Sequence, residues 1–518
     1  SSHFSSRTRQ YLALTLGQSS VVFGRKKWSS LGDMLLSRFS SLRSLASRQN
    51  RPSCTSRVLA RVGGLTTRPF ATRVHLDPKI PGHRIIEDLS KAVGASFHTS
   101  EFAEKLDKED PLSYLRSQYH FPKTASGEAC VYLCGNSLGL QSSLTVPYVT
   151  EELEKWQQYG VEGHFSDVNK IRPWVTADEN CRDDMAAIVG AKPVEVAIMN
   201  SLTVNLHLLM AAFYKPTAGR FKILMEGKAF PSDKFALSSQ AVFHGYEASE
   251  AVVEMWPREG ESTLRTEDIV SKIHTMGNEL AIIIFGGVQY YTGQLFDMAA
   301  ITRAGHAVGC KVGFDLAHAV GNAPLELNKW GPDFACWCTY KYLNSGPGNI
   351  AGAFVHERHK DDQTLTRLAG WWGHRKEDRF VMEHKFIASS GAQSFMLSNP
   401  PVLCIAALRA STDMFKEATM PRLREKSVKL TAYLESLIDT ELAGRVRTLT
   451  PREPQERGAQ LSLVFDVNVK KVQEAIAAKG IICDVREPDV MRIAPAPMYN
   501  SFGDVRRFVF VLKEALQE

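Results

Sequence analysis

Two short apolar runs near the middle of the chain each end in polar side chains that an apolar core would not choose. The first run carries Asp315 and then His318, and the second carries Tyr340 and Lys341. A carboxylate and an amine at the ends of two buried strands suit pyridoxal 5'-phosphate (PLP). This cofactor needs an anion to keep its pyridine nitrogen protonated and a lysine to form a Schiff base. An edge lysine that reaches solvent explains Lys341 equally well when it is taken alone.

Two turns upstream carry hydroxyl groups where a predicted strand gives way to a helix. Leu202 and Thr203 stand at the first turn, and a hydroxyl beside free N–H groups at a helix N-terminus can bind phosphate. The second turn reads Phe230, Pro231, Ser232 and Asp233. Phe230 could stack on an aromatic cofactor ring with a gain of about 1 kcal/mol. Each turn alone is better explained by a helix N-cap, but together with Asp315 and Lys341 they favour a PLP site.

The elements that must position these residues alternate along the chain. The predicted strands are 194–199, 221–225, 280–285, 311–316, 334–339 and 350–356. The predicted helices between most of them are 204–214, 233–243, 266–275 and 299–308. Such alternation predicts an α/β fold with a mostly parallel sheet covered by helices on both faces. Ligands of such sheets bind beyond the C-terminal ends of the strands, where the polar residues above fall.

The segments on either side of this alternation have a different character. Before it lie residues 131–140, predicted as a strand that enters a Gly-Asn-Ser-x-Gly turn, and an amphipathic helix, 149–159, with Leu153 and Trp156 on one face. After it, the predicted elements of a smaller α+β domain are helices 401–416, 420–438, 469–479 and 504–516, and strands 461–467, 481–485 and 491–495. We expect four parts: an N-terminal extension 1–76, a segment 85–165 that contributes to the small domain, a large PLP-binding domain 166–385 and a small domain 386–518.

The positive net charge belongs to the N-terminal extension. Residues 1–76 hold thirteen Lys or Arg and one acid, a net charge of +12, so the rest of the +6 chain carries −6. The body of the protein is therefore not predicted to bind nucleic acid. The extension has the composition of a mitochondrial transit peptide. Because the chain begins with Ser rather than Met, untranslated sequence read as protein is the alternative.

Cysteine spacing and hydropathy exclude other classes of site. The nine cysteines form neither CxxC pairs nor a disulfide framework, so we expect no metal site and reduced thiols in an intracellular compartment. No apolar run approaches the roughly 18–20 residues that span a bilayer, and no membrane association is predicted.

Eight segments together resemble one family. SLTVNLHLLM, KAFPSD, YYTGQ, GFDLAHAVGN, DFACWCTYKYLN, AGWWGH, SNPP and MRIAPAPMYNSF are similar to the kynureninases, fold-type I PLP enzymes. The likeness runs from about residue 85 to the C-terminus. It implies hydrolysis of L-kynurenine or 3-hydroxy-L-kynurenine to L-alanine and anthranilate or 3-hydroxyanthranilate, in tryptophan catabolism and NAD biosynthesis. It also implies a homodimer with the active site at the subunit interface, in the cytoplasm. The composition of the N-terminal extension makes the mitochondrion the alternative compartment.

The resemblance assigns roles to particular residues. Lys341 becomes the Schiff-base lysine and proton shuttle, Tyr340 a cofactor contact and candidate acid/base, and Asp315 the partner of the pyridine nitrogen. The other implied cofactor contacts are Leu202, Thr203, Phe230, Pro231, Ser232, Asp233, His318, Trp371 and Asn399. The implied substrate contacts are Arg492 for the α-carboxylate, and His164, Ser398 and Asn399 for the aromatic ring. An arginine suits the first task because it can bind a carboxylate bidentately.

Two departures from the family and two alternatives remain. Gly286 stands where the family has a hydroxyl residue that contacts the cofactor, so that hydrogen bond is absent. The segment after His164 is also a few residues longer than the common pattern. The alternatives are another fold-type I lyase such as a cysteine desulfurase, which needs a mobile catalytic cysteine, and a non-catalytic PLP-fold protein, which would have lost Lys341 or Asp315.

Overall fold

A seven-stranded sheet forms the centre of the computed structural model, which describes residues 82–167, 173–382 and 384–517. Its strands lie in the order β2-β8-β7-β6-β5-β3-β4. Their bounds are β2 Val196–Ile198, β3 Lys222–Glu226, β4 Val252–Met255, β5 Leu280–Gly286, β6 Lys311–Asp315, β7 Phe334–Trp337 and β8 Gly352–Val355. The predicted extension 1–76 lies outside the described residues.

Most neighbouring strands of this sheet are parallel, as the alternation predicts. β4, β3, β5, β6 and β7 pair in parallel, whereas β8 is antiparallel to both β7 and β2. The central strands are buried on both faces and read as continuous apolar runs, as parallel strands do. β4 was not predicted from the sequence, because its four residues at the sheet edge are only half-buried and include a glutamate.

Helices cover both faces of the sheet, since successive residues of a strand point to opposite sides. Ile283 and Phe285 pack into one core and Ile282 and Ile284 into the other. The helices of the first core are α6 Glu179–Val189, α10 Thr266–Met276, α11 Met298–Ala307 and α13 Val402–Ala418. Those of the second are α7 Leu202–Phe213 and α8 Pro231–Phe243. Two short helices, α9 Ala248–Ala251 and α12 Leu327–Trp330, complete the region.

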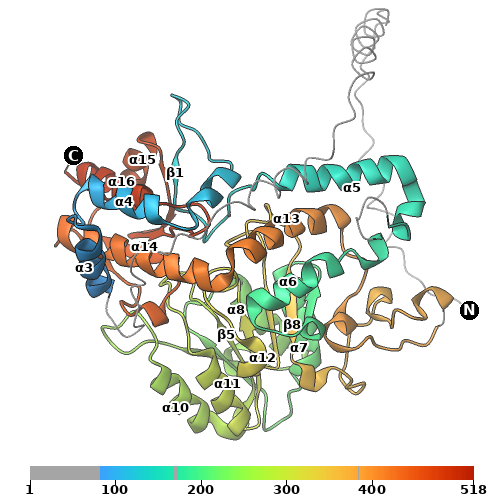
Figure 1. Cartoon of the computed structure of the whole chain (residues 1–518). Coiled ribbons are helices and arrows are strands. Elements are labelled where there is room, and N and C mark those ends of the chain that lie inside the picture. The colour runs from blue at the N-terminus through green and yellow to red at the C-terminus, as the bar shows by residue number, and fades with distance from the viewer. Residues whose placement is uncertain (1–81, 168–172, 383, 518) are drawn as a thin grey trace, which may run out of the picture. The chain divides into compact units, whose positions relative to one another are not determined.

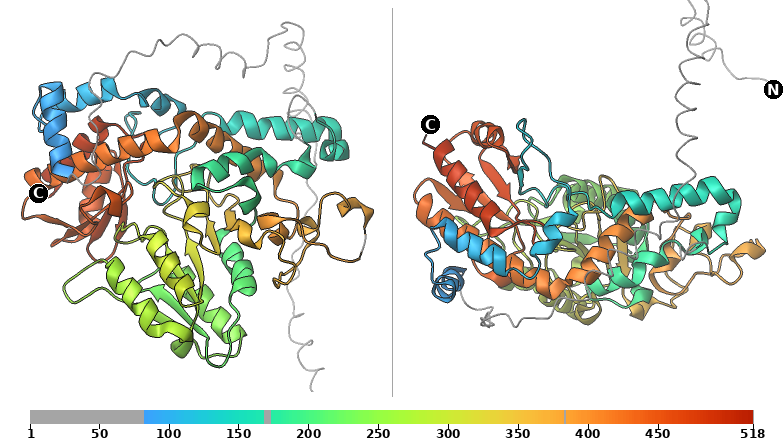
Figure 2. Two further views of the ribbon diagram at one scale, coloured as in Figure 1. Left: turned by 60° about the horizontal axis from the view of Figure 1, so that its bottom comes forward. Right: turned by 45° about the horizontal axis from the view of Figure 1, so that its top comes forward.

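A smaller antiparallel sheet, ordered β12-β13-β10-β9, follows near the C-terminus. Its strands are β9 Val446–Thr448, β10 Leu461–Phe465, β12 Asp484–Arg486 and β13 Val490–Ile493. The helices around it are α3 Gly82–Val93, α4 Ser100–Glu109, α14 Met420–Glu441, α15 Val469–Ala478 and α16 Phe502–Ala515. Figure 2 shows α14 in orange beside the blue α3 and the red α16, both of which it contacts. This is the smaller α+β region that the sequence predicts.

The strand predicted to enter the Gly-Asn-Ser turn is short, β1 Val131–Tyr132, and the turn begins at Gly135 as predicted. A second strand prediction in this region is wrong in extent. The single strand expected over 481–485 is divided. β11 Ile481–Ile482 pairs in parallel with β1, while β12 joins the antiparallel sheet.

The long helix α5, Thr145–Tyr159, lies beside α13 (Figure 1). Its apolar face is solvent-facing in this chain, since Leu153 is 42% and Trp156 63% exposed. The buried side chains of the helix are Glu152 and Lys155, and Glu152 accepts a hydrogen bond from the indole N–H of Trp174 at 2.8 Å. Within the described residues, no helix combines the length and apolarity needed to cross a membrane.

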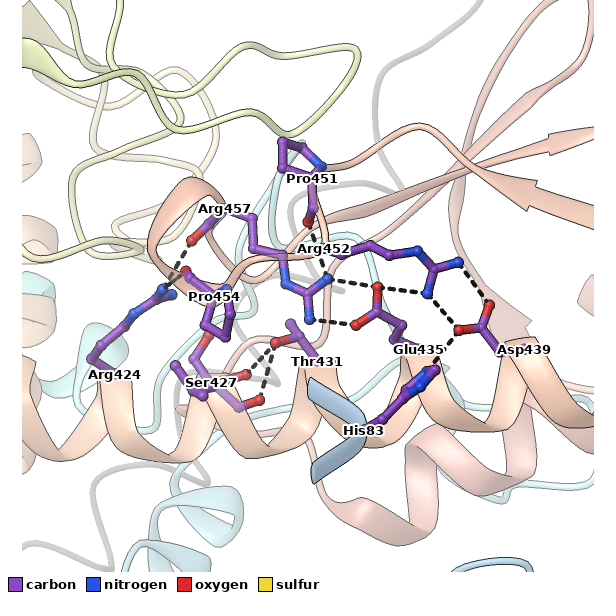
Figure 3. A network of polar contacts seen from close by, with 11 residues as sticks. His83, Arg424, Ser427, Thr431, Glu435, Asp439, Pro451, Arg452, Pro454 and Arg457 are labelled. Atoms are coloured by element: carbon purple, nitrogen blue, oxygen red, sulfur yellow. Dashed lines mark hydrogen bonds and ion pairs between the residues drawn. The ribbon is translucent and has the colours of Figure 1, made fainter. Parts of the chain in front are cut away.

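A buried ionic network anchors α14 to the loop between β9 and β10 (Figure 3). Glu435, on α14, accepts hydrogen bonds from both terminal nitrogens of Arg457 at 3.1 and 3.0 Å. Both residues are almost completely buried. Arg452 extends the network from Glu435 to Asp439, which also contacts His83 on α3. The loop between β9 and β10 and the helix α3 are therefore both bound to α14 by side-chain contacts.

Candidate active site

One cavity gathers most of the residues to which the sequence assigns chemistry. It opens where β6 and β7 end, and Asp315, the last residue of β6, pairs with Gly286 on β5 and Cys336 on β7. The lining residues are Leu202, Thr203, Glu226, Phe230, Ser232, Asp233, Gly286, Val288, Tyr290, Asp315, Ala317, His318, Tyr340 and Lys341. The C-terminal ends of parallel strands are where such folds bind ligands.

Lys341 and His318 form the reactive end of this cavity. The Lys341 Nζ atom lies 2.9 Å from Nε2 of His318. Burial, followed by the charge of Lys341, holds the pKa of His318 well below its usual range. The imidazole is therefore neutral and accepts a hydrogen bond from the ammonium group, which leaves its Nδ1 as the protonated nitrogen. That Nδ1 atom is buried without a hydrogen-bond partner among the described residues.

Asp315 and Asp233 form a carboxyl pair beside the lysine. Asp315 is almost fully buried and accepts the backbone N–H of Ala317 at 2.7 Å. Burial raises the pKa of both carboxyl groups, and the neighbouring Asp315 raises that of Asp233 further. Since the two are hydrogen-bonded, one proton resides on Asp233 and the negative charge on Asp315. That charge is available to a cationic ring nitrogen.

Glu226 is a third carboxyl group in the cavity, and sequence reasoning missed it. It ends β3, is 4% exposed, and both of its oxygens accept the backbone N–H of Gly286, at 3.2 and 3.1 Å. Burial raises its pKa to about 7, with a smaller contribution from Asp315. A Cβ atom at Gly286 would lie 3.0 Å from Glu226, so a glycine there keeps this carboxyl close to the strand end. Its place at the end of an apolar strand was the available signal.

The lining of the cavity also carries hydroxyl groups at two helix N-termini. Thr203 Oγ1 and Ser232 Oγ lie 3.0 Å apart, at the first turns of α7 and α8. Two helix N-termini with hydroxyl groups form a suitable phosphate site. Phe230 is 46% exposed, and its ring lies 6.0 Å from the Nζ atom of Lys341. Pro231 is the first residue of α8 rather than a lining residue.

Besides Pro231 and Arg492, four residues with assigned roles are not among those that line this cavity. Trp371 is 45% exposed and donates its indole N–H to the carbonyl of Arg379. Ser398 and Asn399 are exposed on the surface. His164 is half-buried, with Nδ1 3.0 Å from the carbonyl oxygen of Val161. In a single chain, the roles of these residues stay predictions.

Arg492 lies next to the cavity without lining it. It is 1% exposed and donates to the carbonyl oxygen of Tyr290, a lining residue, at 2.8 Å. Its charge also lowers the pKa of His318. The guanidinium forms an ion pair with Asp484, a partner that sequence reasoning did not identify.

The residues of this cavity fit PLP. A buried anion, an amine and a pair of hydroxyl groups at helix N-termini correspond to the ring nitrogen, the aldehyde and the phosphate of the cofactor. The unpartnered Nδ1 of His318 is consistent with a ligand that completes the cavity.

The C-terminal part of the chain matches a known family. Residues 423–512 match the family described as Kynureninase C-terminal domain. The kynureninase of Myxococcus xanthus is 54% identical over 423 residues, covering 82% of this chain and 99% of that protein. The kynureninase of Mus musculus is 48% identical over 433 residues, covering 80% of this chain and 92% of that protein.

Solved structures of lower identity share the fold. The apo cysteine desulfurase of Thermococcus onnurineus superimposes with a TM-score of 0.62 at 16% identity, over 80% of this chain and 98% of that one. A cysteine desulfurase from Escherichia coli gives a TM-score of 0.63 at 18% identity, over 78% of this chain and 98% of that one. This architecture, the fitted cavity and relatives about 50% identical over about 80% of the sequence establish that the chain belongs to the kynureninases, fold-type I PLP-dependent enzymes.

Proposed function

We propose that this cavity cleaves both L-kynurenine and 3-hydroxy-L-kynurenine by hydrolysis. The products are L-alanine with anthranilate or 3-hydroxyanthranilate. The observation that supports this most directly is the placement of Lys341 with Asp315 and His318 in one buried cavity. Kynureninase activity and the use of PLP follow from the family.

The roles of the cavity residues follow from their charges. When bound, PLP supplies an aldehyde for covalent attachment and a conjugated ring that withdraws electrons from the attached carbon. Asp315 keeps the ring nitrogen protonated, and the proton on Asp233 holds the single negative charge on Asp315. Lys341 would hold the cofactor covalently, and its free amine would move the Cα proton of the substrate. Neutral His318 orients the Nζ atom of Lys341.

Tyr340 is proposed to serve as acid or base where water adds to the γ-carbonyl and the Cβ–Cγ bond breaks. Burial raises the pKa of its phenol above the usual value. Tyr340 therefore keeps its proton at neutral pH and can donate it to oxygen or carbon. Its ring lies 5.9 Å from Nζ of Lys341, so both groups can reach one substrate.

We also propose that two chains share each active site. Trp371 and Phe165 both pack edge-on against Phe380, each at 5.3 Å between ring centroids, and all three are exposed. We call these three residues the aromatic surface. A second copy that covered this surface could receive His164, Ser398 and Asn399 at its own cavity, where they would face the substrate ring. Exposed aromatic clusters of this kind are typical of interfaces.

The compartment is proposed from the family resemblance to be the cytoplasm. The Arg- and Ser-rich sequence of residues 1–76 makes the mitochondrion the alternative. Fractionation of cells that express the full chain with a C-terminal tag separates the two locations.

The direct test supplies purified protein and PLP with each substrate in turn and measures the aryl acid and alanine. We expect both products in equal amounts, and a Lys341→Ala variant that folds but shows neither Schiff-base absorbance nor turnover. Schiff-base absorbance without products would contradict the proposed reaction. Turnover by Lys341→Ala would contradict the role of the lysine.

A cysteine desulfurase is the competing function, because the solved structures of that class share the fold. Its chemistry needs an accessible cysteine thiolate. Of the eight cysteines in the described residues, seven are buried and Cys404 is half-buried. Burial raises the pKa of Cys338, which lies near the cavity, and so disfavours its thiolate.

A further inference from the structure

The β12–β13 hairpin places three charged residues together at the edge of the cavity. Asp484 and Arg492 are directly opposite each other on the antiparallel strands. Arg486, two residues after Asp484, lies on the same face of β12. The nearby Tyr290 ring lies 6.0 Å from the guanidinium carbon of Arg492 and 5.9 Å from that of Arg486.

Asp484 binds both arginines through both of its oxygens. Nε and Nη2 of Arg492 each lie 2.9 Å from an oxygen of Asp484. For Arg486 the corresponding distances from Nε and Nη2 are 3.0 and 3.2 Å. The second arginine thus contacts the same two carboxylate oxygens, and this second ion pair restrains the carboxylate that binds Arg492.

The hydrogen bonds of Arg492 leave one edge of its guanidinium available. An arginine has five N–H donors. Asp484 takes the edge formed by Nε and Nη2, and the carbonyl oxygen of Tyr290 accepts from Nη1 at 2.8 Å. Two N–H groups remain, one on each terminal nitrogen, and an arginine with free groups on both terminal nitrogens can bind a carboxylate bidentately when they lie on one edge.

We propose that Asp484 is a positioning residue that orients this edge of Arg492 toward the α-carboxylate of the substrate. The inference rests on the proposed function and on the carboxylate-binding role that the family resemblance implies for Arg492. Two arginines share one carboxylate, so the cluster carries a net charge of +1 that a substrate carboxylate neutralises. Arg492 is 1% exposed, and a buried guanidinium without Asp484 would lose its fixed orientation as well as its counter-ion.

The test compares Asp484→Asn with wild type in the PLP-loaded enzyme. We expect the KM for kynurenine to rise roughly 10–100-fold, the cost of a hydrogen bond to a charged group, with kcat changed much less. A second ligand separates orientation from general damage. The decarboxylated amine of kynurenine lacks the α-carboxylate, so its inhibition constant should stay within about threefold of wild type.

The matched control is Asp489→Asn, in the same hairpin. The side chain of Asp489 makes no hydrogen bond or ion pair with another described residue, so the KM for kynurenine should be unchanged. If Asp484→Asn does not fold, Asp484→Glu is the second variant, because it keeps the charge but displaces Arg492. We again expect a higher KM for kynurenine and a nearly unchanged inhibition constant for the amine.

Two outcomes would overturn the inference. One is that the KM for kynurenine and the inhibition constant of the amine rise by the same factor, and the other is that the KM for kynurenine is unchanged. Arg492→Lys distinguishes this failure from failure of the proposed function. If Arg492→Lys raises the KM for kynurenine while Asp484→Asn does not, only the positioning role is wrong. If Arg492→Lys also leaves the KM unchanged, Arg492 does not bind the substrate carboxylate.

Discussion

Three carboxyl groups and one amine share the cavity at the C-terminal edge of the sheet. Asp315 has the nearby charge of Lys341, and Asp233 has a hydrogen bond to Asp315. Glu226 has hydrogen bonds from backbone groups, that of Gly286 among them, and it forms no ion pair with a described residue. A buried carboxyl without a cation favours its neutral form, which agrees with the raised pKa of Glu226.

Glu226→Gln should therefore stabilise the apoenzyme at alkaline pH. The pKa of Glu226 is about 7 in the folded chain against an ordinary value of 4.5. Folding is thus favoured by this group below about pH 4.5, and that advantage is lost as the pH rises toward 7. The shift corresponds to about 3 kcal/mol, so the variant should exceed wild type by up to that amount at pH 8.

Urea unfolding of both apoproteins at pH 5 and pH 8 measures the difference. Asp233 and Asp315 also make the free energy of unfolding fall as the pH rises. Because both residues are present in both proteins, their contributions cancel in the comparison. Equal free energies of unfolding for variant and wild type at pH 8 would show that Glu226 is ionised in the folded chain without cost.

At the scale of elements, α14 joins the two parts of the chain. Its first turns pack into the core beneath the large sheet and its later turns into the core of the small one, through Leu423 and Leu434 respectively. The ion pair between Glu435 and Arg457 binds the loop after β9 to the C-terminal half of the helix. The helix and this pair together hold the small sheet, and with it Arg492, beside the cavity.

Glu435→Ala should destabilise the protein by about 3–5 kcal/mol, because it leaves the guanidinium of Arg457 buried without its counter-ion. The control is Asp439→Ala, on the same helix. Its partners Arg452 and His83 are more than half exposed, so a loss of at most about 1 kcal/mol is expected. Denaturant unfolding measures both variants. If both variants lost a similar free energy of unfolding, burial of the Glu435 ion pair would not be what makes it important.

At the scale of the whole molecule, the residues assigned to the site divide into two groups. Those on the large sheet converge on one cavity. Trp371 and Asn399 lie elsewhere, with Trp371 in the aromatic surface. A symmetric dimer would allow each chain to complete the site of its partner.

Mixing two inactive variants tests this arrangement. Lys341→Ala removes the amine, and Asn399→Ala removes the group proposed to come from the second chain. Mixed dimers contain one intact site in two and form half of a random mixture, so activity should recover to about a quarter of wild type. No recovery after refolding the variants together would place both residues in the site of one chain, and full activity of Asn399→Ala alone would remove its role.

Much of this fold was predictable because its strands are fully buried. The runs at β5, β6 and β7 are apolar on both faces, and each appears in the sequence within two residues of its observed C-terminal bound. Strands at the sheet edge or with mixed burial were harder to predict from the sequence. β4 was missed, and the region of β11 and β12 was taken as one strand.

The sequence by itself placed Asp315 and Lys341 at the ends of two apolar runs, because a charged side chain at the end of an apolar run is visible without any knowledge of packing. Asp315 is the last residue of β6, whereas Lys341 lies in the loop that follows β7, which ends at Trp337. The tertiary structure alone decided which groups surround them. Glu226 reaches the cavity through the pairing of β3 with β5, and Asp484 meets Arg492 through the register of a hairpin. These contacts join residues whose separation in the sequence carries no periodic signal, so only the folded chain brings them together.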